Sequence, residues 1–426
     1  MVFRHYSLSI SIDLFHPTPD NMKAITLASM AALTASAAYG GGLYQVAEET
    51  ESSIPLQWSV GMDAVWDDNT TPGPAATDGD ETFSLNPFVG VTFASVTPQT
   101  TMALYARLGL VYYLDAPQAA GTEDVYGQSR IGFDLSHRFT ERLRFTSRNY
   151  LAYEIEPDYA QGFSTNRQLG EYLYWSTDNS IGFRWSERFA TYTGLTLTGL
   201  QYDDIADADR FTWTAYNQLR YQLSPQTVLT ASYRYSETSG ADNASDSTNH
   251  YLLVGAEHRV SANTILVVNA GAQLREVDRV GAGNSSDPYL EFSMRTQVNQ
   301  DWGYRAFIRY GSEDYDTVVL APTLAEFDNK PTLRIGVSGE YKISPRLALF
   351  GGVNVVSSSY EDGRFIAGGA AADQDETLIN AYIGSSLKFT DYLYGTLTYN
   401  FTNSSSDIAN RDYDRNRISV GVRAEF

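Results

Sequence analysis

The chain contains no cysteine, which excludes disulfide scaffolds and thiolate metal sites. Beyond the N-terminal region it also lacks long hydrophobic runs, since no stretch stays apolar over the ~20 residues that a transmembrane helix needs. A helical membrane protein is therefore excluded. A transmembrane β-barrel is not, because barrel strands carry apolar residues only at alternate positions.

Basic residues are scarce: 30 Lys and Arg stand against 51 Asp and Glu, giving a formal net charge of -21. No basic stripe could neutralise phosphates, so a nucleic-acid partner is excluded. The sequence has no phosphate-cradling glycine loop, zinc-ligand spacing or dinucleotide fingerprint, so we expect no cofactor and no metal. Aromatic residues are abundant at 13%, and 30 of them are tyrosines. Such a tyrosine excess is typical of proteins that place amphipathic rings at membrane–water boundaries.

The N-terminus has the features of a secretory signal peptide. Residues 22–38 begin Met22-Lys23, continue with small apolar residues and end at a small-residue site, Ala35-Ser36-Ala37. A single anchoring helix is the weaker interpretation, because the apolar segment is too short to span. Residues 1–21 contain two prolines and two aspartates and do not belong in a signal peptide. We expect 1–21 to be a non-native upstream extension, 22–38 a cleaved signal, 39–55 a periplasmic segment and 56–426 the barrel.

Apolar and polar residues alternate along most of the remaining chain. At the C-terminus, Ile418, Val420, Val422, Ala424 and Phe426 alternate with Ser419, Gly421, Arg423 and Glu425. The same period of two recurs in 290–298, 333–343 and 379–389. Successive side chains of a strand point to opposite faces, so each segment is predicted to be a strand with one apolar and one polar face.

Short and long connections also alternate. Short turns are predicted near Thr97-Pro98, Thr140-Glu141, Ser186-Glu187, Ser224-Pro225, Ser261-Ala262, Gln300-Asp301, Ser344-Pro345 and Thr390-Asp391. Long polar loops are predicted near 67–81, 115–125, 156–168, 203–209, 238–248, 279–287, 314–329, 361–375 and 404–412. Short turns on one side and long loops on the other predict an all-β, antiparallel up-and-down transmembrane barrel of about eighteen strands, with both termini in the periplasm. Sixteen strands is the alternative, if 56–66 and 83–93 do not span.

Charged side chains within the predicted strands fall at the polar positions of the alternation, and so on the polar face of each strand. We expect this face to line a polar lumen, because a basic residue facing mid-bilayer lipid costs roughly 2–4 kcal/mol. The predicted lumen-lining residues that could set selectivity are Arg107, Arg144, Arg148, Arg220, Arg234, Arg295, Arg305, Arg309, Arg334, Glu257, Glu291 and Glu340.

The whole mature chain resembles the β-barrel porin and outer-membrane β-barrel families. The resemblance rests on hairpins such as 211–223 and 227–235, joined at Ser224-Pro225, and on a last strand that ends in Phe426. It implies that Ile418, Val420, Val422, Ala424 and Phe426 form a signal for the barrel assembly machinery. It also implies residence in the cell outer membrane, in contact with lipid and lipopolysaccharide.

The favoured function is passive diffusion of small hydrophilic solutes, because about eighteen strands can enclose a water-filled channel. An arginine-lined constriction would favour anions; alternatively, the arginines pair with acids across the wall. Loop 314–329 is the candidate for narrowing the pore. A second hypothesis is export or assembly of a secreted polysaccharide, with Tyr105, Tyr150, Tyr216 and Tyr382 stacking on sugars or simply filling volume. A structural barrel without open conductance is a third.

A surface lipase or protease is the weakest hypothesis, and we do not expect an enzyme. His137 and His258 lie near short turns on the outward parity, whereas His250 borders a predicted loop, close to Asp246 and Ser247. A histidine beside an acid is too common to indicate catalysis. The acidic loop residues Asp67, Asp68, Asp78, Asp80 and Glu81 do not match calcium-loop spacing, so a solvated, self-repelling loop is expected there.

Overall fold

The computed structural model describes residues 53–70, 81–115, 117, 123–155, 171–203, 209–240, 246–278, 282–313, 318–320, 323–409 and 411–426. The predicted extension 1–21, the signal peptide 22–38, Asp78 and Asp80 lie outside these ranges, and the first strand begins at Ile54. No helix of the described residues is long and apolar enough to cross a membrane.

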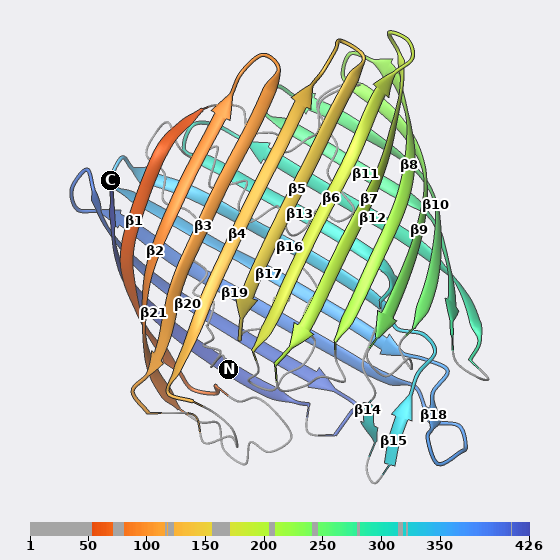
Figure 1. Ribbon diagram of the computed structural model, residues 1–426. Helices are drawn as coiled ribbons and strands as arrows, with labels where there is room; N and C mark the ends of the chain where they lie inside the picture. Colours follow the sequence, from red (N-terminus) through yellow and green to blue (C-terminus); the bar gives the residue numbers. More distant parts are fainter. Residues whose placement is uncertain are drawn as a thin grey trace, which may run out of the picture.

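Eighteen long strands form one sheet. Their bounds are β1 Ile54–Asp67, β2 Thr82–Val96, β3 Thr100–Tyr113, β4 Val125–Arg138, β5 Leu143–Glu154, β6 Tyr172–Arg184, β7 Phe189–Tyr202, β8 Arg210–Ser224, β9 Thr227–Gly240, β10 Ser247–Ser261, β11 Thr264–Val277, β12 Asn284–Gln297, β13 Trp302–Ser312, β16 Pro331–Ser344, β17 Leu347–Tyr360, β19 Gln374–Lys388, β20 Leu393–Ser406 and β21 Tyr413–Glu425. Each pairs antiparallel with its neighbours in the chain, and Figure 1 shows the strands tilted around a barrel.

The first and last strands close the sheet. β1 and β21 pair from Ser59 opposite Glu425 to Asp67 opposite Arg417. Two backbone hydrogen bonds between Trp58 and Phe426, of 3.0 and 2.8 Å, extend this seam to the C-terminus. Closure removes the free edges that a sheet cannot expose to hydrocarbon. The predicted antiparallel barrel of eighteen strands is confirmed, and sixteen is excluded because both β1 and β2 take part.

The predicted turns are confirmed as well. All eight short connections occur where expected, and threonine or serine side chains stabilise several of them: Thr140 Oγ1, for instance, accepts from the backbone N–H of Leu143 at 3.0 Å. At the opposite end, some strands run into segments that were expected to be loops. β9 continues to Gly240 and β12 begins at Asn284.

A small sheet at the loop end was not predicted. It consists of β14 Val318–Leu320, β15 Thr323–Glu326 and β18 Arg364–Phe365, which come from two predicted loops. Below it, Ala325, Phe327, Tyr360, Ala371 and Ile408 form a buried apolar cluster. Figure 1 shows β14, β15 and β18 beyond the ends of the long strands, beside β16 and β17.

Burial in the barrel wall is the reverse of that in a soluble domain. On β21, Val420 and Val422 are 52% and 50% exposed, whereas on β1 the carboxylate-bearing Asp63 is 1% exposed. Exposed apolar side chains at every second position would be unstable in water over a surface of this size. Against hydrocarbon they are favourable, and the polar side chains then face the interior. The chain is therefore a transmembrane barrel with an apolar exterior and a polar lumen.

Candidate pore lining

The twelve predicted lumen-lining residues all share the inward face of the wall. Several of their direct chain neighbours, such as Leu108 beside Arg107 and Ile335 beside Arg334, are exposed apolar residues on the outside. The inward residues do not line the pore as isolated charges. Several form ion pairs with residues two or three strands away around the wall.

Arg220 and Glu257 form the most enclosed of these ion pairs. The guanidinium Nη1 and Nη2 donate to Oε1 and Oε2 of Glu257 at 2.5 and 2.8 Å. Gln218 accepts a further bond from Nη1 at 3.2 Å, and the guanidinium carbon lies 5.6 Å from the centre of the Tyr192 ring. A bidentate pair of this kind fixes both side chains, so Arg220 is tied to the wall.

Arg234 and Glu291 form a second bidentate pair. Nη1 and Nη2 of Arg234 on β9 each donate to Glu291 on β12 at 3.1 Å. The hydroxyl of Tyr289 also donates to Glu291, and the amide of Asn269 on the intervening β11 donates to it at 3.4 Å. The carboxylate therefore joins residues from β9, β11 and β12.

Glu313, which was not predicted as a lumen residue, links two predicted arginines. It follows β13 directly and accepts from Arg309 at 2.5 Å and from Arg334 at 2.7 Å through each carboxylate oxygen. Burial alone would raise the pKa of Glu313, but the charges of Arg334 and Arg309 outweigh it and hold the pKa well below its ordinary value. The carboxylate is therefore ionised over the whole physiological pH range.

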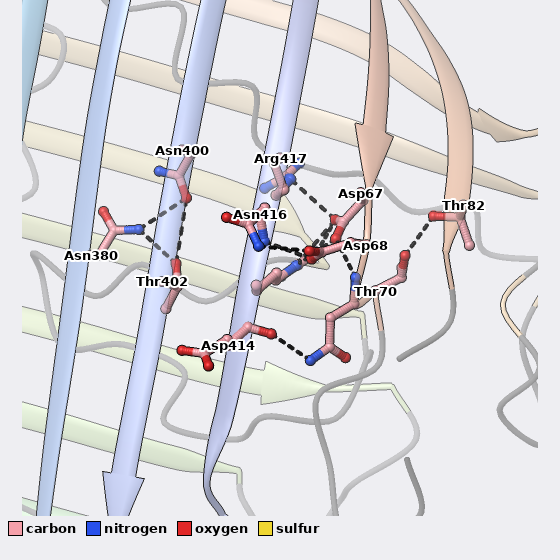
Figure 2. A network of polar contacts seen from close by, with 12 residues as sticks. Asp67, Asp68, Thr70, Thr82, Asn380, Asn400, Thr402, Asp414, Asn416 and Arg417 are labelled. Carbon is pink, nitrogen blue, oxygen red and sulfur yellow. Dashed lines mark hydrogen bonds and ion pairs between the residues drawn. The ribbon is translucent and has the colours of Figure 1, made fainter. Parts of the chain in front are cut away.

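Asp67 ties the seam between β1 and β21, as Figure 2 shows. Its carboxylate accepts from Arg415, with the shortest contact 2.5 Å from Nη2, and lies 3.2 Å from Nε of Arg417. Next to it, Asp68 accepts from the backbone and side-chain nitrogens of Asn416, both at 2.6 Å. The expectation of a solvated, self-repelling loop is wrong for these two residues, because basic and amide groups of β21 compensate their charge.

Glu81 is exposed, and it accepts a 2.7 Å hydrogen bond from the indole N–H of Trp66. The sequence nevertheless indicated that Asp67 faces inward. Asp67 is four residues from Asp63 and so lies on the same face of β1, whereas the apolar Met62 lies on the other face.

Two further ion pairs involve acids that were missed. Arg107 donates to Asp63 at 2.8 Å across β2, and its guanidinium lies 3.7 Å from the centre of the Phe88 ring. Arg130 donates to both oxygens of Glu154. Both acids lie on the inward face, so the alternation of polar and apolar residues could have identified them as lumen residues. It could not have identified the arginines that they bind.

Arg144 and Arg148 are held within the β4–β6 wall. Arg148 lies directly opposite Asp134 on one neighbouring strand and opposite Asp178 on the other. Arg144 donates to Ser136 Oγ through Nε at 2.7 Å and through Nη2 at 2.5 Å. These contacts fit the alternative that the arginines tie the wall.

Arg295 and Arg305 belong to the β12–β13 hairpin. They lie directly opposite one another on β12 and β13, near the short-turn end. Glu340 lies on β16, opposite Gly303, two residues before Arg305 along β13. Two guanidinium-bearing side chains and one carboxylate-bearing side chain therefore lie close in register on this part of the lumen face.

Three of the four predicted inward tyrosines, Tyr105, Tyr150 and Tyr216, pack or hydrogen-bond within the wall. Tyr150 belongs to a buried cluster with Tyr172, Tyr174 and Tyr202, against which Tyr105 packs. Tyr216 donates a 2.8 Å hydrogen bond to Asp178. The ring faces of this cluster are covered by one another, so they are not available for stacking on sugars.

The His250 region does not form a catalytic arrangement. Ser247 is buried on the inward face of β10, whereas His250 lies on the outward face, three residues away. Nδ1 of His250 is 2.8 Å from the hydroxyl of Tyr233, and the carboxylate of Asp246 accepts from the backbone N–H of Gly240. Within the described ranges, no group of three or more His, Asp or Glu is arranged to hold a metal ion.

Comparison with known proteins gives only structural matches. No protein-family model matches the chain, and no curated protein matches its sequence. The BenF-like porin of Pseudomonas fluorescens Pf-5 is similar with a TM-score of 0.47 and 9% identity, covering 88% of this chain and 99% of that one. OpdK of Pseudomonas aeruginosa, crystallised with vanillate, has a TM-score of 0.45 and 11% identity over 87% of this chain and 99% of its own. OccAB4 of Acinetobacter baumannii has a TM-score of 0.44 and 12% identity over 88% and 99%.

Proposed function

We propose that this protein is a porin-like channel of the outer membrane, through which small hydrophilic solutes diffuse passively. The observation that carries the proposal is the charged inward face of a closed eighteen-strand barrel. Eight strands would fill their interior with side chains, whereas sixteen to eighteen leave an aqueous passage. Inward charges such as Arg107 and Arg309 keep part of their side chains exposed, 23% and 31%, which fits a hydrated lumen.

The selectivity that we propose is a weak preference for anions. The ion pairs of Arg220 with Glu257 and of Arg234 with Glu291 cancel these charges locally, so these residues contribute little to the selectivity. Arg295 and Arg305 bring two guanidinium groups to neighbouring positions where the passage approaches the short-turn end. Charged groups of this kind set the sign of selectivity in a wide pore, and salt screens their effect.

The outer membrane is the proposed location because it is where bacterial single-chain barrels with an even number of strands reside. The signal peptide at 22–38 and the terminal strand ending in Phe426 support export and recognition by the assembly machinery. The short turns would then lie in the periplasm. The long loops and the β14–β15–β18 sheet would lie outside the cell, beside lipopolysaccharide.

Recording from planar bilayers tests this proposal. The refolded mature chain should produce stepwise conductance that is ohmic at high salt, with a reversal potential in a KCl gradient on the anion side. The same preparation, denatured by heat before addition, is the control. Folded, inserted barrels without any conductance would overturn the channel proposal and favour a structural role.

A further inference from the structure

The lipid-facing side of β5–β8 carries a polar patch at mid-strand. It consists of Ser147 and Asn149 on β5, Thr177 and Asn179 on β6, Thr193 on β7 and Asn217 on β8. Register places them together: Asn149 lies opposite Thr177, Ser147 opposite Asn179, and Thr193 opposite Asn217. They share the outward face with Ile181 and Leu195, which are 54% and 42% exposed.

The patch lies at the depth of the hydrocarbon core. On β6, Thr177 and Asn179 lie between two groups of aromatic rings: Trp175 packs 6.0 Å from Phe211, and Phe183 packs 4.7 Å from Trp185. The nine residues from Trp175 to Phe183 span about 26 Å along the strand, which at a tilt of about 40° is about 20 Å of depth, within the roughly 25 Å apolar band bounded by aromatic girdles. Polar groups between such girdles would face lipid tails.

The opposite wall lacks this polarity. β17 and β19 lie halfway around the barrel from β6 and β7. At the corresponding depth they present Val353, Val355, Ile379 and Ile383, and Ile383 is 62% exposed. The patch is therefore a local feature of one side, the side of β5–β8 in Figure 1.

Hydrogen bonds within the patch satisfy it only in part. Thr177 donates to Asn149 at 2.8 Å, Asn179 donates to Thr177 at 2.8 Å, and Asn217 donates to Thr193 at 2.6 Å. Each asparagine carries two N–H donors and a carbonyl acceptor. In the described part of the chain, the carbonyl oxygens of Asn179 and Asn217 accept no hydrogen bond. Leaving such groups in hydrocarbon is unfavourable.

We propose that β5–β8 form the contact with a second copy of this chain in the membrane. The patch is neutral and carries donors and acceptors on the same residues, so it is complementary to itself, as a two-fold contact requires. Neutral asparagine, serine and threonine side chains are also the groups that hold membrane segments together inside lipid. Because every copy inserts in the same direction, the symmetry axis runs along the membrane normal and brings equal depths together.

Cysteine crosslinking tests the contact, since the wild-type chain has no cysteine. Leu195 lies opposite Asn179 in register, so Leu195→Cys places a thiol inside the patch without removing its polar residues. Ile383→Cys is the matched control, because Ile383 and Asn179 each lie five residues before the short-turn end of their strand. In liposomes with a large excess of lipid, oxidation should give roughly tenfold more dimer for Leu195→Cys, the effect of one or two polar contacts in lipid.

A triple variant separates the contact from folding. Asn149→Leu, Asn179→Leu and Asn217→Leu, added to Leu195→Cys, should lower the dimer yield to the Ile383→Cys level. The barrel should remain folded, as shown by its β circular dichroism, because leucine suits a lipid-facing position. Equal yields for Leu195→Cys and Ile383→Cys would overturn the proposal, and so would an undiminished yield in the triple variant. Crosslinking in native membranes only to a different protein would also overturn it.

Discussion

Arg220 on β8 and Glu257 on β10 form a bidentate ion pair across the lumen face of β9, through two hydrogen bonds of 2.5 and 2.8 Å. Their side chains are 1% and 4% exposed, so the pair lies out of contact with bulk water. Such a pair is costly to form, because both charges lose their hydration, but breaking it costs more, because one charge is left buried alone. The ion pair therefore stabilises the register of β8, β9 and β10 without adding net charge to the lumen.

Glu257→Gln should lower the free energy of unfolding by about 3–5 kcal/mol, because it strands the Arg220 guanidinium in a buried position. Urea titration of the folded barrel in lipid measures this change. The double variant Arg220→Leu/Glu257→Leu should recover more than half of the loss. Equal or additive losses in the double variant would contradict the pairing.

Asp67→Asn should loosen the seam between the first and last strands. The variant removes the negative charge that compensates Arg415 and Arg417, so we expect a loss of about 1–3 kcal/mol in unfolding free energy. Asp391→Asn is the control, because Asp391 is 99% exposed beside Lys388 and its ion pair should contribute less than about 1 kcal/mol. If Asp67 did not stabilise the seam, the two variants would lower the free energy of unfolding equally.

Val420→Arg should impair membrane assembly, whereas Arg423→Gln should be tolerated. Val420 faces lipid at mid-strand, where an arginine costs roughly 2–4 kcal/mol. Arg423 points inward, 5.6 Å from the Tyr394 ring and 2.5 Å from Glu425. The fraction of folded barrel in isolated outer membranes, detected by its mobility shift on unheated gels, distinguishes them. Equal tolerance at both positions would show that the two faces are assigned wrongly.

The ion pairs of Glu313 with Arg309 and Arg334 should weaken only at strongly acidic pH. In the folded state Arg334 and Arg309 hold the pKa of Glu313 below the value of about 4.3 expected for an unfolded chain. The stabilisation is therefore complete above about pH 5 and is lost as the pH falls through the folded pKa. The difference in urea midpoint between wild type and Glu313→Gln should be constant from pH 8 to about pH 5 and should shrink below about pH 4. A difference in urea midpoint that grows on acidification would contradict the stabilising role of these ion pairs.

Arg295→Gln/Arg305→Gln should move the reversal potential in a KCl gradient toward cations, because it removes two neighbouring positive charges of the lumen face. The effect should fade in molar salt, where screening acts over about 3 Å. Arg346→Gln, in an exposed short turn, is the control for the loss of an arginine. An unchanged reversal potential in the double variant would mean that other groups set the selectivity.

The strands, the turns and the inward face could be predicted because each depends on local signals. Alternation in 333–343 gives the face of every residue, and Ser344-Pro345 gives the turn. Partners could not be predicted in the same way. Asp67 and Arg415 are 348 residues apart in the chain, and Arg234 reaches Glu291 over two intervening strands. These contacts depend on barrel closure and side-chain length, neither of which has a period in the sequence.

Two structural features escaped sequence reasoning for a specific reason. The sheet of β14, β15 and β18 joins short segments of two separate loops, so no single segment is long enough to show a strand pattern. The patch around Asn149 and Asn179 places neutral polar residues at apolar positions of the alternation, and neutral residues give no charge signal in the sequence. The partner of that patch, a second copy of the chain, has no signature in one sequence.

The central claim is that alternate positions of one strand face water and lipid around a conducting lumen. Asn354 and Val353 are adjacent on β17, with Asn354 inward and Val353 45% exposed on the outside. A negatively charged, thiol-specific methanethiosulfonate reagent should alter the single-channel current of Asn354→Cys and leave that of Val353→Cys unchanged. Open channels that respond equally at both positions, or at neither, would contradict the claim.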